Sequence, residues 1–206
     1  MAEINNAYPV AVSIDYPAKP DRLTTFFRLI TVIPILIILV LLGGVQYGPL
    51  DQNYYAVGVG LLVAPTLLMI LFRKKYPRWW FDWNLSLTRF STRVLSYLLL
   101  LTHEYPSTDE DQAVHIEIAY PEAEKELHRA MPLVKWFLVI PHLIVLCILY
   151  IAVTLCTIIA WFAILFAGVY PRGMFDFVVG VIRWSIRMGA YSILLTTDKY
   201  PPFSLN

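Results

Sequence analysis

Arginines one helical turn apart are the most regularly spaced charged residues in this sequence. Arg89 precedes Arg93 by four residues and Arg183 precedes Arg187 by the same interval, so each pair shares one face of a helix. Guanidinium groups on one face of an otherwise apolar helix are typical of contact with anionic lipid headgroups. The residues predicted to contact headgroups or the membrane interface are Arg78, Arg89, Arg93, Arg172, Arg183 and Arg187.

No residue spacing typical of catalysis is present. The sequence has no phosphate-binding loop, no nucleophile elbow, no HExxH motif and no Cys/His pattern of a metal site. Cys147 and Cys156 lie in an apolar run and are predicted to be small buried residues. His142 lies within a predicted span; a haem or quinone contact there is the minor alternative, and an interhelical hydrogen bond is favoured. We expect no enzyme activity, no cofactor and no metal.

The composition predicts an integral membrane protein. The chain has 206 residues, of which 58% are hydrophobic and 15% charged, and its mean hydropathy is +0.62. A soluble domain is about 45–50% apolar and about 25% charged, and a chain this short cannot cover the excess apolar surface by itself. The formal net charge of +1 gives no electrostatic drive toward nucleic acid, so no nucleic-acid partner is expected.

An internal repeat organises the chain. Residues 76–102 and 170–196 match at a constant offset of 94, so that Tyr76-Pro77-Arg78 meets Tyr170-Pro171-Arg172. Upstream, the segment VAVSIDYP (10–17) matches VHIEIAYP (114–121), and RLITVIP (28–34) matches KWFLVIP (135–141). We interpret this as a tandem duplication of residues 1–108 and 109–206.

Each copy is predicted to contain a short strand, two membrane helices and an arginine-bearing helix. Val10 to Ile14 and Val114 to Ile118 alternate between apolar and polar residues, which indicates half-buried strands. Two such strands should pair with each other or with the edge of another chain. The second pair of spans requires a tight hairpin near Tyr150–Leu155; one very long helix is the competing interpretation. The predicted spans are 26–45, 54–72, 131–150 and 152–169.

The arginine-bearing helices are predicted over 82–101 and 176–195. In the favoured interpretation they lie flat in the membrane interface. In the alternative each forms a third span of its copy, and two cations per span would then lie at mid-bilayer. Asp82 and Asp176 are predicted to cap these helices. The fold class is thus a mainly α integral membrane protein with tandem copies. The predicted interfacial aromatic residues are Trp79, Trp80, Trp83 and Trp184.

The charge distribution predicts the orientation in the membrane. With four spans, the outer face holds only the 46–53 loop and the turn near 150–155, and neither contains Lys or Arg. All 16 basic residues then lie on one side, which the positive-inside rule assigns to the cytoplasm. We expect a multi-pass protein of the bacterial cytoplasmic (inner) membrane with both termini cytoplasmic.

The motif from Tyr170 to Phe203, together with the IPHLIVL stretch at 140–146, resembles bacterial membrane proteins of the domain-of-unknown-function 4389 family. The resemblance extends over nearly the whole chain and is closer in the second copy. It implies a multi-pass membrane fold and supplies no established activity and no catalytic residues.

These observations favour a non-catalytic membrane scaffold or an accessory subunit of a larger membrane complex. The alternative is a protein that binds lipid headgroups or passes small solutes, and a redox subunit that depends on His142 ranks third. The expected partners are membrane lipids of anionic type, and either further copies of this chain or a membrane complex.

Overall fold

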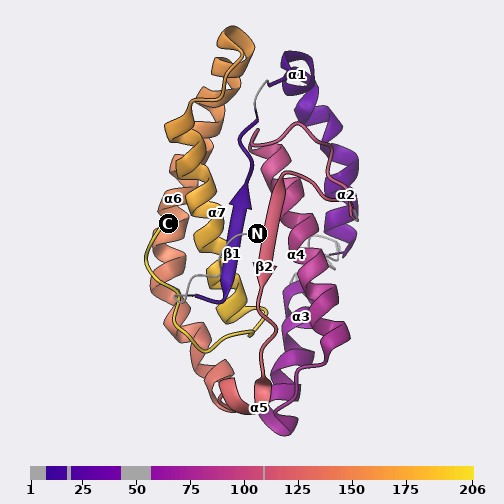
Figure 1. Cartoon of the computed structure of the whole chain (residues 1–206), viewed down its shortest axis with the longest axis vertical. Coiled ribbons are helices and arrows are strands. Elements are labelled where there is room, and N and C mark those ends of the chain that lie inside the picture. The colour runs from indigo at the N-terminus through magenta and orange to yellow at the C-terminus, as the bar shows by residue number, and fades with distance from the viewer. Residues whose placement is uncertain (1–7, 18–19, 43–56, 109) are drawn as a thin grey trace, which may run out of the picture.

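The computed structural model describes residues 8–17, 20–42, 57–108 and 110–206 (Figure 1). The predicted outer loop at 46–53 and the end of the first predicted span lie outside these residues.

Two short strands form a sheet at the centre of one face (Figure 1). β1 (Val10–Ile14) and β2 (Val114–Ile118) pair antiparallel, with Val12 opposite Ile116 at the centre. In both strands the first, third and fifth side chains are buried, as the alternation predicted. The prediction that the two segments pair with each other is confirmed.

Two helices of 21 residues lie directly beneath the sheet. α7 (Arg172–Ser192) packs against β1, and α4 (Arg78–Leu98) packs against β2, so each strand contacts the arginine-bearing helix of the other half of the chain. A Tyr-Pro pair precedes each helix. The proline holds the backbone extended just before the helix begins, and its carbonyl accepts the first helical hydrogen bonds. Both helices bury an apolar face inside the protein, and their predicted placement in the membrane interface stays a prediction.

The longest helix, α6 (Met131–Ala167), runs beside α7 without interruption for 37 residues. The predicted hairpin near Tyr150–Leu155 is therefore wrong. That stretch contains no glycine or proline, and the hydroxyl of Thr154 bonds back to the carbonyl of Tyr150 within the helix. The helix ends at Gly168, whose φ of +70° is a left-handed conformation that favours glycine.

The first half of the chain replaces this long helix by shorter pieces. α1 and α2 are bent by 53° relative to each other, and Pro34 near the bend lacks the amide that would continue the helical bonds. α3 begins after residues 43–56, which the structure does not describe, and continues directly into the π-helical turn η1. A short helix, α5, precedes α6. The bounds are α1 Arg22–Thr31, α2 Ile33–Leu42, α3 Val57–Leu68, η1 Met69–Arg73 and α5 Ala123–Glu126.

Among the helices of the described residues, α6 has the length and apolar composition needed to cross a membrane. The bent pair of α1 and α2 would be a second such element if it formed one broken span.

Candidate membrane-docking surface and buried cations

Apolar side chains are exposed along the entire length of α6. Phe137 near its start is 74% exposed and Phe166 near its end is 79% exposed. The single charged residue of this helix, Lys135, is fully buried. The other exposed large apolar side chains of α6 include Leu133, Trp136, Ile140, Ile144, Ile148, Ile151, Leu155, Ile158 and Phe162.

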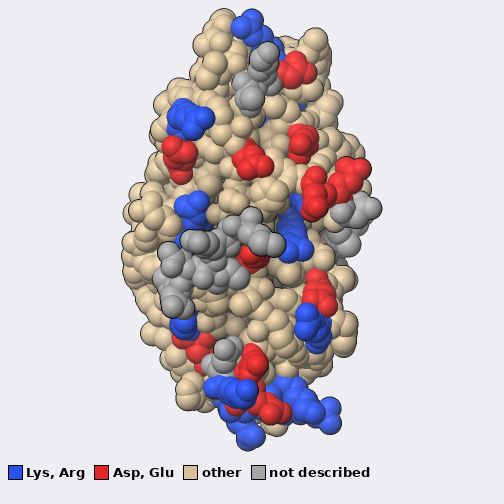
Figure 2. Space-filling view, viewed as in Figure 1, with Lys and Arg blue, Asp and Glu red and all other residues tan. Residues whose placement is uncertain are grey.

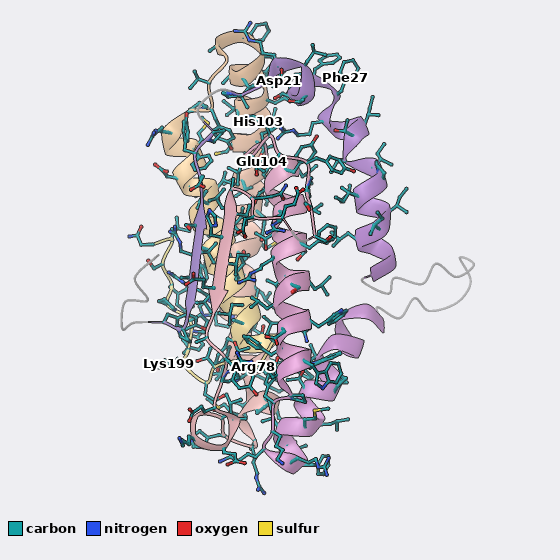
Figure 3. The ribbon with its side chains drawn as sticks, turned by 45° about the vertical axis from the view of Figure 1, so that its right-hand side comes forward. Asp21, Phe27, Arg78, His103, Glu104 and Lys199 are labelled. Atoms are coloured by element: carbon teal, nitrogen blue, oxygen red, sulfur yellow. The ribbon has the colours of Figure 1, made fainter. Side chains whose placement is uncertain are left out.

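The helices of the first half add to this surface. α1 packs on α6, where the indole of Trp161 donates to the carbonyl oxygen of Thr25 and stacks on Phe26. Figure 3 shows Phe27 on α1 pointing away from the protein. We call the exposed apolar side chains of α1, α2, η1 and α6 the apolar surface. Its members outside α6 are Leu23, Phe26, Phe27, Ile30, Ile33, Ile37, Ile38 and Phe72.

The sheet side of the molecule is charged. Figure 2 shows acidic and basic side chains spread over this face from one end to the other. Asp15 and His115, which flank or lie in the strands, form an exposed pair with 3.2 Å between Oδ2 and Nε2. The sheet stands beside the middle of α6, not beyond one of its ends (Figure 1). The charged sheet side and the apolar surface on α6 therefore both extend along the axis of α6.

The paired arginines of α4 and α7 bond to backbone carbonyls within the protein. Arg89 Nε donates to the carbonyl oxygen of Ile116 at 3.0 Å, and Arg183 Nε donates to that of Val12 at 3.1 Å. These acceptors are the central residues of β2 and β1. Arg93 donates to Ser107 and Arg187 donates to Asn206. All four thus bind strands or loops; a role in headgroup binding stays a prediction.

Arg78 and Arg172 lie at the surface over tyrosine rings. The guanidinium carbon of Arg78 is 5.3 Å from the ring centre of Tyr120, and that of Arg172 is 4.4 Å from the ring centre of Tyr16. The two contacts connect corresponding positions of the two halves. Both tyrosines also donate across the halves, Tyr120 to the carbonyl of Tyr76 and Tyr16 to that of Tyr170.

Asp82 and Asp176 do not cap helices, contrary to the prediction. The helices begin four residues earlier, at Arg78 and Arg172, so both carboxylates lie exposed in the second turn.

The predicted interfacial tryptophans differ in exposure. Trp79 and Trp83 are exposed, and Trp80 stacks on Trp83 while donating to the hydroxyl of Thr66. Trp184 is buried, so its predicted interfacial position is wrong. It donates from Nε1 to Nδ1 of His142 at 2.9 Å, which is the interhelical hydrogen bond expected for that histidine. His142 also stacks on Phe203.

Two buried cations occupy matching positions of the repeat, one on α1 and one on α6. Lys135 on α6 lies 2.8 Å from Oδ1 of Asp198 and donates to the carbonyl of Thr197. Arg28 on α1 is 2% exposed; it donates to the carbonyl of Tyr97 at 2.8 Å, and its Nη2 lies 3.3 Å from Nδ1 of His103. Burial, with the Arg28 charge second, lowers the pKa of His103 below its ordinary value.

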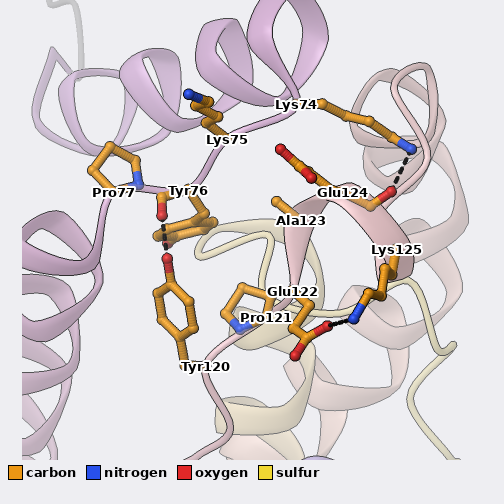
Figure 4. Close-up of a pocket in the computed structure, with 10 residues that line it drawn as sticks. All are labelled: Lys74, Lys75, Tyr76, Pro77, Tyr120, Pro121, Glu122, Ala123, Glu124 and Lys125. Carbon is orange, nitrogen blue, oxygen red and sulfur yellow. Dashed lines mark hydrogen bonds and ion pairs between the residues drawn. The ribbon is translucent and has the colours of Figure 1, made fainter.

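A pocket of ≈ 540 Å³ lies where η1 ends and α5 begins (Figure 4). The Lys74 ammonium donates to the carbonyl of Glu124 at 2.7 Å, and Lys125 pairs with Glu122 at 2.7 Å. Burial raises the pKa of Tyr76, at the inner wall, to about 12. Among the described residues, no group of three or more His, Cys, Asp or Glu side chains is placed to hold a metal ion. Cys147 and Cys156 are free thiols, and Cys147 is exposed, contrary to its predicted burial.

Comparison with known proteins identifies a family for the second half. The model of the family described as Domain of unknown function (DUF4389) matches residues 129–204, which include α6, α7 and the C-terminal segment. No curated protein and no solved structure matches the chain.

Proposed function

We propose that this chain, which belongs through residues 129–204 to the DUF4389 family, is a non-catalytic scaffold or accessory subunit docked on a membrane through its apolar surface. In this proposal the helices that carry the apolar surface lie in the plane of one leaflet, and the sheet side faces water and is available to partners.

The main support for this proposal is the position of the charged sheet beside the middle of α6. An upright α6 would place the sheet, with Asp15 directly after β1, at the depth of the hydrocarbon core, where one charge costs about 2.5–3.5 kcal/mol or more. A flat α6 leaves the sheet and Asp15 in water and places Phe137 and Phe166, at its two ends, in lipid.

The length of α6 also favours the flat orientation. A helix of 37 residues is about 55 Å long at 1.5 Å per residue, against a hydrocarbon core of about 30 Å. An upright helix that kept all of its apolar residues in the core would tilt beyond the usual range of about 0–40°. The four-span arrangement needs a turn in α6, so we do not propose it.

The relation between the two halves supports the same orientation. Val12 and Ile116 are equivalent in the repeat and pair with each other, so a two-fold axis between them would stand perpendicular to the sheet. We infer that the halves arose by duplication and are related by this axis. Because the axis would lie along the membrane normal, both halves would turn the same side to the lipid.

Vesicle flotation tests the proposal. The purified full chain should float with vesicles of zwitterionic phosphatidylcholine, and Ile144→Glu with Ile151→Glu should reduce the bound fraction by about tenfold or more. The matched control adds two carboxylates to the sheet side, Ser13→Glu with Ala119→Glu, and should float like the unmodified chain. Equal flotation of both variants, or none by the unmodified chain, would refute docking through this surface.

Headgroup binding is a second candidate because cations gather at one end of the molecule. Arg73, Lys74, Lys75 and Arg78 lie together in sequence where η1 passes into α4, and Figure 2 shows basic side chains, with acidic ones among them, at this end. Such a cluster attracts anionic leaflets by about 1 kcal/mol per cation. Lys74→Gln with Lys75→Gln should then weaken flotation only with vesicles that contain phosphatidylglycerol. No observation on the described residues favours solute passage.

A further inference from the structure

Arg28 is a buried cation with no carboxylate partner among the described residues. Its guanidinium is held by one backbone carbonyl, one histidine nitrogen and the ring of Tyr97, 4.3 Å from the guanidinium carbon. Its Nε is buried and has no acceptor in the described structure. A buried charge that lacks an opposite charge is unfavourable, and an anion from outside the chain would relieve it.

The corresponding cation in the second half has such an anion. Lys135 takes the place of Arg28 in the repeat, and Asp198 takes the place of Glu104. Asp198 lies 2.8 Å from Lys135, whereas Glu104 accepts a hydrogen bond from the backbone of Ala113. Figure 3 shows His103 and Glu104 near the start of α1. The two halves therefore differ in whether the carboxylate of the chain reaches the cation.

A pocket of ≈ 360 Å³ lies next to Arg28, between α1, the end of α4 and α6. Its volume is within the range of about 300–1,000 Å³ that small-molecule sites occupy. Trp161 forms part of its wall, and the exposed side chains Ile158 and Phe162 connect it with the apolar surface. A ligand that fits it has an apolar body. The residues that line it are Thr25, Arg28, Leu98, Leu100, Thr157, Ile158, Trp161 and Phe162.

We propose that this pocket binds a long-chain carboxylate, with the carboxylate against Arg28 and the alkyl chain along Trp161 and Ile158. The small exposed area of Arg28 favours a compact carboxylate over a bulky phosphodiester headgroup. Guanidinium and carboxylate match in charge and in hydrogen-bond geometry. Ligand binding goes beyond membrane docking, and the test in detergent separates the two.

The probe is dodecanoate labelled with ¹³C at the carboxyl carbon, titrated into the delipidated full chain in detergent micelles. We expect a saturable shift of the carboxyl signal, with dodecan-1-ol competing at least about tenfold more weakly, because hydrogen bonds to charged groups exceed neutral ones. Arg28→Met should weaken dodecanoate binding by about tenfold or more and make it similar to that of the alcohol.

Two variants keep Arg28 in place and control for misfolding. Thr157→Phe fills the pocket and should abolish saturable binding, whereas Thr154→Phe, one turn earlier on an exposed position outside the pocket, should leave it unchanged. Equal affinity for the acid and the alcohol would overturn the role of Arg28. Binding that Thr157→Phe leaves intact, or retention of phospholipid in place of dodecanoate, would overturn the proposal.

Discussion

At the residue scale, the two buried cations meet the cost of desolvation in different ways. Lys135 has a carboxylate, a carbonyl and the ring of Tyr191, whose centre lies 5.0 Å from Nζ. Removing one member of such a pair leaves the other charge buried, which costs about 3–5 kcal/mol. We therefore expect Lys135→Met to destabilise the chain by about that amount, because Asp198 is only 13% exposed. Lys135→Met with Asp198→Asn should recover most of the loss; chemical unfolding in detergent measures both, and equal losses would contradict a buried ion pair.

His103 should make stability depend on pH. Burial and Arg28 lower its pKa from the ordinary value of 6.5, so the native state favours the neutral ring. The stabilisation is present above about pH 6.5 and is lost as the pH falls through the lower native pKa. The melting temperature should decrease between about pH 7 and pH 5, and the decrease should be smaller in His103→Asn. An identical pH dependence in both proteins would show that other groups cause it.

At the element scale, the arginine-bearing helices hold the sheet in place. A hydrogen bond from a charged donor contributes about 1.5–3 kcal/mol, which is large for a sheet of two strands that is marginal by itself. Arg183→Met should speed amide hydrogen exchange in β1, and Arg89→Met should speed it in β2. Each variant is the control for the other. Equal effects on both strands would indicate global destabilisation and contradict this assignment.

Two glycines of α7 should respond to alanine in opposite directions. A Cβ at Gly180 would lie 2.8 Å from the Cβ and 2.9 Å from the carbonyl oxygen of Leu205, so Gly180→Ala should displace the C-terminal segment at a cost of about 1–3 kcal/mol. Gly189 has open space, and Gly189→Ala should stabilise the helix by about 0.5–1 kcal/mol. Thermal unfolding with limited proteolysis of residues 201–206 measures both; a stable Gly180→Ala variant would contradict the contact.

The elements that local patterns determine could be predicted from the sequence. The alternation of apolar and polar residues predicted both strands, and the apolar content predicted the helices that carry the apolar surface. The continuity of α6 was missed because the two halves differ there: 43–56 in the first half contain turn residues that the second half lacks. The partners of Arg89 and Arg183 could not be predicted, since the opposing carbonyls belong to the other half and become neighbours only when the strands pair.

At the scale of the whole molecule, the distribution of charge and apolar surface favours the proposed docking over spanning. A protein that spans a membrane carries its charges beyond the two ends of its apolar helices. Here the charged sheet side (Figure 2) and α6, which carries much of the apolar surface, extend along the same axis (Figure 1). Amphipathic helices lie in the membrane interface with the apolar side in the acyl region, and the proposed docking applies the same rule to the whole molecule.

The side of the membrane from which each end of α6 is accessible decides between docking in one leaflet and spanning. In a variant with Cys147→Ser and Cys156→Ser, single cysteines at Arg129→Cys and Gly173→Cys stand before and after α6 in exposed positions. A flat helix leaves both on the same side of the membrane, so a membrane-impermeant maleimide should label both from one side of the membrane and neither from the other. A spanning α6 would separate them by the bilayer, and labelling of one from each side would refute docking in a single leaflet.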